Sequence, residues 1–516
     1  MATRESELSA LLSSAALVMI GGIISSAAKM GERIIIGRLL SPDAYGEVSI
    51  GLALFTITST IALAGCTQGV SRFIPRYDSI EDQRGVWLSG LLIATPLSLV
   101  ISILMFVFAE SIAAHFFETD YAESFIRLLA LTLPFVANFR IIVAAIRGFE
   151  NTTYPITIQN FFYPFLRIGL IAGLLLAGMS AITVGIAYFF AALLTFVIAH
   201  LLLRRFMNLR GEYQTHVSEL LTFSAPLIVS TVVSVMLTKT DTLMLGYFRS
   251  SSEVGMYDAA YSLASGLTVV LGAFGFLYLP LASRLDADGE RKIVDDIYAT
   301  TTKWVYVITF PVFLLFVIFP NNLILIFFGP SYADAASVLP ILAVGFFLSA
   351  AAGRNRETLS AIGLTAWIAI GNLIGIVLNI LINIVLIPRF GFMGAGVASV
   401  VSLFSLHTTI CGVLAIRYNI TPFSSEAIRC YVFLPAILLP LAHILSPWIV
   451  ISAMTLIPIL IAVSVVSLVV VVLIGGLEPD DIVVITVLED KIGISVPLVR
   501  RWIPDANQEV DLFSAD

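Results

Sequence analysis

Long apolar stretches separated by short polar segments follow one another along nearly the whole chain. About 20 apolar residues in a helix cross the ~30 Å hydrocarbon layer of a bilayer. Repetition of such stretches predicts about fourteen membrane-spanning helices, at 9–36, 45–69, 86–109, 124–147, 155–177, 181–203, 219–245, 254–281, 298–319, 333–352, 364–387, 393–416, 427–445 and 448–474. The first stretch is too long, and too charged at its end, for a cleavable signal peptide. We therefore expect an all-α integral membrane protein.

The composition agrees with a membrane protein, and the cysteine spacing indicates neither a zinc site nor a disulfide-stabilised fold. Of the 516 residues, 59% are hydrophobic and 12% are charged, whereas a soluble globular protein carries roughly 25% charged residues. The net charge of −7 and the scarcity of lysine beside arginine are typical of a halophilic prokaryote. The cysteines Cys66, Cys411 and Cys430 lie far apart and form neither a zinc-binding spacing nor a disulfide framework. We expect no cofactor, no metal ion and no nucleic-acid partner.

Basic residues gather on one side of the predicted spans. If the N-terminus is cytoplasmic, the inside segments hold twenty of the 28 Lys and Arg residues, and the outside loops hold Arg38, Arg249 and Arg389. Cytoplasmic loops of membrane proteins carry an excess of Lys and Arg. We therefore expect a multi-pass protein of the cell membrane with both termini in the cytoplasm.

An internal repeat relates two halves of the chain. "IIIGRLLSPDAYGEVS" aligns with "LMLGYFRSSSEVGMYD" at an offset of 209 residues, which places Glu32 on Asp241. "NTTYPITIQN" aligns with "GLTAWIAIGN" at 212 residues, and "GMSAITVGIA" aligns with "GFMGAGVASV" at 213 residues. Six spans per copy is an even number, so both copies enter the membrane from the same side as a parallel repeat.

The repeat predicts two six-helix lobes, two extra helices and a tail. The expected segments are an N-terminal lobe at 1–216, a C-terminal lobe at 217–420, the extra helices at 421–476 and a cytoplasmic tail at 477–516. In the tail, Ile485, Leu488 and Ile492 form one apolar stripe, which predicts a short helix. This helix either packs against the body of the protein or docks glycan-assembly enzymes.

Several motifs, taken in order, resemble a known transporter family. They are "GRLLSPDAYG", "DTLMLGYF" followed by "VGMYDAAYSL", "FGPSYADAASVLPIL" and "RFGFMGAGVAS". Over about residues 8–475 the chain resembles the polysaccharide-exporter branch of the multidrug/oligosaccharidyl-lipid/polysaccharide superfamily. The resemblance implies a flippase, not an enzyme. Such a flippase turns an undecaprenyl- or dolichol-linked oligosaccharide from the cytoplasmic to the outer leaflet, for assembly of cell-surface polysaccharide or glycoprotein glycan.

The first predicted span carries the charged residues Lys29, Glu32 and Arg33 near its end. Each charge within a span costs roughly 2.5–3.5 kcal/mol on insertion scales, so such groups face a cavity or one another. Lys29 and Glu32 are spaced to pair, which leaves Arg33 to bind a phosphate with its planar, two-pronged donor set. Alternatively, Glu32 and Arg33 reach into the outer headgroups and have no ligand role.

The fifth span and its repeat partner supply further candidates. Asn160 and Arg167 are seven residues apart on one helical face, and their repeat partners are Asn372 and Asn379. Arg167 lies mid-span, where it needs a counterion, a water-filled cavity or an anionic substrate. A basic first half and an asparagine stripe in the second half fit a site for pyrophosphate and sugar hydroxyls, although buried asparagines are also common packers between helices. Arg140 is expected at the cytoplasmic rim, where it would meet an incoming headgroup.

The seventh predicted span ends its polar stripe in Asp241, two residues after Lys239. Three roles are open for Asp241: it binds a cation that drives transport, it neutralises Lys239, or it caps the helix near the outer surface.

Two other functional classes compete with a flippase. A membrane-embedded glycan polymerase or ligase would carry its catalytic groups on a long outer loop, and the longest one here, 110–123, is too short for a catalytic domain. The chain also has no recognisable Ser/His/Asp set or phosphate-cradling loop. A cation-coupled multidrug or small-molecule antiporter of the same superfamily is the stronger rival. Its site would be acidic and aromatic, whereas the first half here carries basic residues.

Overall fold

The computed structural model describes residues 2–119, 121–478 and 481, and within them every regular element is a helix. The first half contains α1 (Ala2–Leu39), α2 (Pro42–Leu63), α3 (Cys66–Phe73), η1 (Ile74–Arg76), α4 (Ile80–Val107), α5 (Ala109–Phe116), α6 (Ala122–Gly148), α7 (Thr153–Ile156), η2 (Thr157–Phe162), α8 (Tyr163–Leu176) and α9 (Ile182–Leu203). The second half contains α10 (Val217–Phe248), α11 (Ser251–Ala264), η3 (Ser265–Thr268), α12 (Val269–Ala287), α13 (Arg291–Ile318), α14 (Pro320–Phe327), η4 (Pro330–Ser337), α15 (Leu339–Ala351), α16 (Asn355–Ala361), α17 (Thr365–Tyr418), α18 (Ser425–Leu445), η5 (Ser446–Trp448) and α19 (Leu456–Leu473).

The expected all-α membrane architecture is confirmed, but the number of fourteen spans is not. Among the described residues, 11 helices are long and apolar enough to cross a membrane, or 12 if the bent pair of η4 and the segment 339–361 counts as one span. The helix α17 covers two predicted spans. Its backbone leaves the helical region at Gly391 (φ 57°, ψ −137°), and Gly371 in its first part packs against Leu406 and Ile410 in its second. The chain therefore folds back at Gly391.

Several predicted spans differ from the observed helices in their bounds or continuity, and the spans at 45–69, 448–474 and 155–177 are examples. The span at 45–69 begins earlier, because the Ser41 side chain accepts a hydrogen bond from the backbone N–H of Ala44 and Pro42 occupies the first helical position. It is then divided into α2 and α3 at Ala64 and Gly65, whose φ angles are 47° and 68°. The span at 448–474 begins only at Leu456. The span at 155–177 is made of α7, the π-helix η2 and α8.

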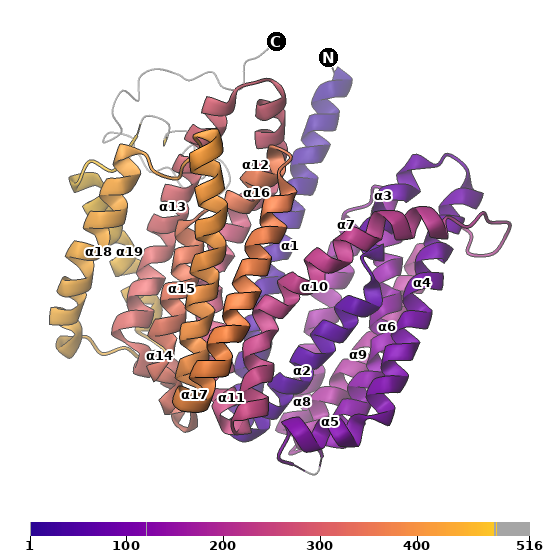
Figure 1. The fold of residues 1–516 in the computed structure, drawn as a ribbon, viewed down its shortest axis with the longest axis horizontal. Coiled ribbons are helices and arrows are strands. Elements are labelled where there is room, and N and C mark those ends of the chain that lie inside the picture. The colour runs from indigo at the N-terminus through magenta and orange to yellow at the C-terminus, as the bar shows by residue number, and fades with distance from the viewer. Residues whose placement is uncertain (1, 120, 479–480, 482–516) are drawn as a thin grey trace.

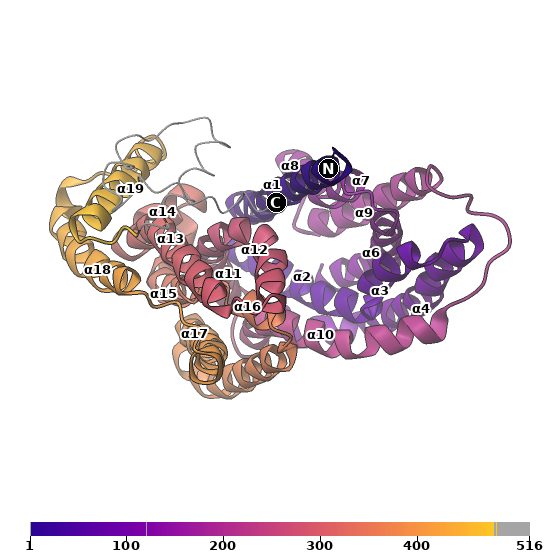
Figure 2. The same cartoon turned by 90° about the horizontal axis from the view of Figure 1, so that it is seen from above.

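The helices form two bundles with α1 and α10 between them (Figures 1 and 2). We call α2–α9 the N-terminal bundle and α11–α17 the C-terminal bundle. The bundles lie farther apart at the end where α1 begins than at the opposite end, where α2 meets α11 (Figure 1). The lobe boundaries expected at residues 216 and 420 stay a prediction.

At the end where the bundles meet, α2 and α11 cross in backbone contact. A Cβ atom on Gly46 would lie 1.8 Å from the carbonyl oxygen of Ser251, and one on Gly255 would lie 2.1 Å from the carbonyl oxygen of Pro42. Only glycine permits this approach. At the repeat offset of 209 residues, Gly46 corresponds to Gly255 and Pro42 corresponds to Ser251. The two contacts are therefore equivalent to each other in the repeat. The crossing therefore lies on the pseudo-two-fold axis of the repeat.

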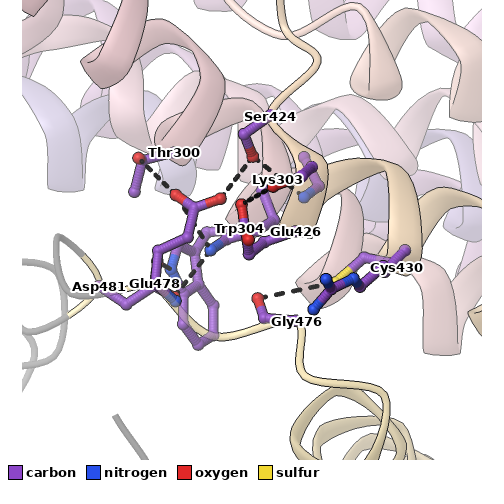
Figure 3. Close-up of polar contacts among 12 residues, drawn as sticks. Thr300, Lys303, Trp304, Ser424, Glu426, Cys430, Gly476, Glu478 and Asp481 are labelled. Carbon is purple, nitrogen blue, oxygen red and sulfur yellow. Dashed lines mark hydrogen bonds and ion pairs between the residues drawn. The ribbon is translucent and has the colours of Figure 1, made fainter. Parts of the chain in front are cut away.

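The segment after α19 is anchored on the C-terminal bundle by a buried polar cluster (Figure 3). Lys303 of α13 forms an ion pair with Asp481 (Nζ to Oδ2, 2.7 Å), and both side chains are almost fully buried. The indole N–H of Trp304 donates to the other oxygen of Asp481 at 2.7 Å, and the backbone N–H of Glu478 donates to Oδ2 at 2.8 Å. The tail helix predicted around residues 485–492 lies outside the described residues.

Candidate functional site

A cavity of about 350 Å³ lies between α1 and the N-terminal bundle. Its lining residues are Ser25, Lys29, Leu63, Thr67, Phe139, Arg140, Ala144, Arg147, Gln159, Asn160, Tyr163, Pro164 and Arg167. Four of these side chains are basic, and none of the described residues in the lining is acidic. The cavity is therefore suited to an anionic ligand.

Local backbone features place these residues together. Arg140 and Arg147 are seven residues apart on α6 and so share one helical face. The π-helix η2 supplies Gln159 and Asn160, and π-helical turns occur frequently at functional sites. A Cβ on Gly21 of α1 would lie 2.9 Å from Nδ2 of Asn160, so the glycine lets α1 approach η2 closely.

Arg167 reaches the cavity but is already paired with Glu32. Its Nε donates to Oε2 of Glu32 at 3.0 Å, and its Nη2 donates to the same oxygen. The hydroxyl of Tyr188 donates to the other oxygen of Glu32 at 2.8 Å. The ring of Tyr188 also lies 4.3 Å from the guanidinium carbon of Arg167. The pairing of Glu32 with Lys29, expected from their spacing, is not what the structure shows.

Once this pair is set aside, the cavity retains three basic side chains. No ion pair is formed by Lys29, Arg140 or Arg147 with any residue that the structure describes. Arg147 makes only a long hydrogen bond to Gln159, at 3.4 Å. Sequence reasoning identified Lys29 and Arg140, but it did not single out Arg147. The spacing of seven residues from Arg140 is the signal that would have found it.

The repeat partners in the second half form a separate, buried cluster around Asp241. Asn379 and Asn383 donate to Oδ1 of Asp241 at 2.8 and 2.7 Å. The hydroxyl groups of Tyr257 and Ser399 donate to Oδ2. In the N-terminal half the acid at this repeat position, Glu32, has an arginine as its partner; here the corresponding position holds Asn379, an uncharged amide.

The asparagines of the second half do not line the cavity. Asn372 donates to Ser234 of α10 at 3.2 Å, and both Asn372 and Asn379 are fully buried. Asp241 forms no ion pair with Lys239 or with any other described basic residue. The role of Asp241 in binding a coupling cation stays a prediction.

Arg33 faces the junction of the two bundles. Its Nη1 lies 2.5 Å from Oδ2 of Asp258 on α11 and donates to Ser49 of α2 at 3.1 Å. The side chain of Arg33 is 19% exposed. In this structure Arg33 is therefore neither a free cavity ligand nor an exposed headgroup anchor. Lys239 is half-buried, within electrostatic range of Arg33, Asp258 and Lys29. The sequence did not single out Asp258.

Comparison with known proteins adds a family assignment to this geometry. Residues 11–286 match the family model described as "Polysaccharide biosynthesis protein", and residues 226–385 match the MatE model. The chain is 24% identical over 331 residues to the "Probable low-salt glycan biosynthesis flippase Agl15" of Haloferax volcanii, covering 64% of this chain and 68% of that protein. It is 29% identical over 180 residues to the "Probable flippase AglR" of the same organism, covering 34% of this chain and 37% of that protein.

Solved structures share the fold at low sequence identity. The lipid II flippase MurJ in an inward closed conformation gives a TM-score of 0.70 with 15% identity, over 88% of this chain and 97% of that chain. An inward-facing multidrug resistance MATE family transporter gives a TM-score of 0.61 with 14% identity, over 74% of this chain and 92% of that chain. These similarities show the fold alone, because one of the two structures is a lipid II flippase and the other is a multidrug resistance transporter.

Proposed function

Since the chain belongs to the polysaccharide biosynthesis protein family, the polysaccharide-exporter branch of the multidrug/oligosaccharidyl-lipid/polysaccharide superfamily, we propose that it turns a lipid-linked oligosaccharide from the cytoplasmic to the outer leaflet. Family membership makes the chain a transporter and not an enzyme. The observation that carries the proposal is the basic cavity, with Lys29, Arg140 and Arg147 free of acidic partners among the described residues.

A diphosphate bound to a polyprenyl lipid is the anion that this cavity fits best. Arginine offers a planar fork that matches phosphate oxygens, and lysine adds a compact point charge. Gln159, Asn160 and Ser25 add neutral polar groups to the lining, which suit the hydroxyl groups of sugars. The polyprenyl tail gains nothing from a polar cavity, so it stays in the surrounding lipid.

The cation-coupled drug antiporter is the second candidate, and the cavity argues against it. An organic cation would meet four basic side chains in the lining and no described acidic one. Like charges placed at such short range are repulsive, and more so away from bulk water. Asp241, the acid that would bind a coupling cation, and its repeat partner Glu32 are both buried and hydrogen-bonded to other side chains.

Binding of a polyprenyl diphosphate to the purified protein tests the proposal. The double variant Lys29→Gln with Arg140→Gln is expected to lose affinity by roughly 100-fold, because each charge-assisted hydrogen bond contributes about 1.5 kcal/mol or more and 1.4 kcal/mol corresponds to about tenfold in affinity. The same polyprenol without phosphate is expected to bind both proteins equally weakly. Arg127→Gln is the matched control, because Arg127 lies on the same helix α6 but pairs with Glu123. Undiminished binding by the double variant would contradict the proposal.

The direction of transport rests on both termini being cytoplasmic, which labelling of single cysteines tests. In a background without the three native cysteines, Glu118→Cys is expected to react with an impermeant maleimide on intact cells. Asp288→Cys, which is also exposed, is expected to react only after permeabilisation. The reverse pattern would invert the orientation.

A further inference from the structure

Asp258 is the polar junction between the two halves of the chain. Its Oδ2 accepts hydrogen bonds from Arg33 of α1 at 2.5 Å, from Tyr45 of α2 at 2.9 Å and from Ser49 of α2 at 2.8 Å. Asp258 itself lies on α11, and its side chain is 6% exposed. All three donors therefore come from the first half, and they converge on one buried oxygen of the second.

This junction sits on the same pseudo-two-fold axis as the glycine crossing. Ser49 and Asp258 occupy equivalent repeat positions, 209 residues apart, and they bond directly to each other. On α2 and α11 they lie one helical turn beyond Gly46 and Gly255, whose backbones touch the opposite helix. The bundles cannot separate at this end unless the bonds to Asp258 break.

The junction is also next to the cavity. Lys29 lines the cavity, and Arg33 lies one helical turn further along α1 on the same face. Lys239 of α10 is close enough to interact electrostatically with Lys29, Arg33 and Asp258, yet it forms no ion pair with a described residue. Arg33 is thus the ion-pair partner of Asp258, one helical turn from a residue that lines the cavity, and Lys239 is a nearby half-buried cation without an ion-pair partner among the described residues.

We propose that Asp258 is an internal substitute for the substrate's phosphate. Its ion pair with Arg33 keeps the α2–α11 crossing closed until a lipid-linked diphosphate binds Arg33 in its place. The inference rests on the function proposed above. In the closed state Arg33 pairs with Asp258 and Lys239 is spare; in the loaded state Arg33 pairs with phosphate and Lys239 pairs with Asp258. Asp258 and Arg33 each keep an oppositely charged partner in both states, which avoids the large cost of leaving either of these charges unpaired in the interior.

Opening of the crossing can be followed by the labelling of a cysteine inside it. Val254 is the repeat equivalent of Tyr45, is fully buried and lies on α11 between Ser251 and Asp258. In a background without native cysteines, Val254→Cys is expected to react slowly with a maleimide. A polyprenyl diphosphate is expected to accelerate the reaction by at least about fivefold, the lower end of the usual coupling between two sites, and the polyprenol alone is not.

Labelling of Val254→Cys in the Asp258→Asn variant is the decisive experiment, because it tests the role of Asp258 without any lipid. Without the carboxylate, Val254→Cys is expected to react at the accelerated rate at once, with no further effect of the diphosphate. The doubly neutral variant Arg33→Gln with Asp258→Asn removes both charges of the buried ion pair together, so it is expected to fold and to react equally fast. Ser49→Ala removes one bond to Asp258 but keeps the ion pair, and is expected to retain slow labelling and its acceleration by the diphosphate.

Slow labelling of both Asp258→Asn and the doubly neutral variant would overturn the inference. If at the same time the cavity binds the polyprenyl diphosphate with affinity that depends on Lys29 and Arg140, the proposed function stands and only the role of Asp258 fails. If the diphosphate does not bind at all, the proposed function fails, and the lipid-free arms still report whether Asp258 keeps the crossing closed.

Discussion

Arg167→Ala is expected to stop export and also to destabilise the protein by about 3–5 kcal/mol, the usual cost of removing one partner of a buried ion pair. The reason is Glu32, which is 3% exposed and would keep its charge next to the cavity without Arg167. Arg167→Lys preserves the charge but not the two donors that reach one oxygen of Glu32, so an intermediate loss is expected. Thermal unfolding in detergent and glycan export in cells are the measurements.

The double variant Arg167→Gln with Glu32→Gln separates charge compensation from substrate contact. The charges of Arg167 and Glu32 cancel, so removing both leaves the net charge of the region unchanged, and Lys29, Arg140 and Arg147 remain in the cavity. We expect stability to return to near that of the unmodified protein and export to recover in part. A stable double variant without any export would instead assign Arg167 to direct contact with the substrate.

Lys303→Met is expected to cost about 3–5 kcal/mol of stability as well, because it leaves the buried Asp481 without its cation. The cluster in Figure 3 holds the segment after α19 against α13. Its loss should therefore expose that segment, and limited proteolysis is expected to cut near residue 478 much faster. Binding of the polyprenyl diphosphate by the molecules that remain folded is expected to be unchanged, because no residue of the cluster lines the cavity.

Arg429→Gln is the matched control for this second prediction. Arg429 donates to the carbonyl oxygen of Gly475, but it is exposed, so its loss is expected to cost less than about 1 kcal/mol. Equal stability of Lys303→Met and the unmodified protein would show that the cluster does not anchor the segment.

The sequence predicted the all-helical membrane architecture, although not the number of spans, because runs of apolar residues and helix caps are local patterns. Ser41 and Ser250 are repeat equivalents that cap α2 and α11 with nearly identical backbone angles, and such caps are readable in sequence. The partners of the charged residues were not readable, since Glu32 and Arg167 are 135 residues apart and Arg33 and Asp258 are 225 residues apart. Spacing along one helix suggested Lys29 for Glu32, but the tertiary fold gave Glu32 an arginine with two donors.

Two further parts of the site lay beyond local patterns. Nothing in the spacing of apolar residues distinguishes the π-helix η2 from an α-helix, although it sets the position of Asn160. The repeat aligned Asn379 with Arg167, but only the structure shows that Asn379 donates to Asp241 in the interior while Arg167 reaches the cavity.

The pairing of Lys303 with Asp481 has a consequence for the order in which the protein is made. The ribosome synthesises Lys303 178 residues before its partner, so α13 enters the membrane with an uncompensated lysine. Such a lysine costs about 2.5–3.5 kcal/mol on insertion scales when it lies near the centre of a span, and less near an end. A chain that stops before residue 478 lacks both carboxylates that lie near Lys303, and we expect it to be less stable than the full-length protein.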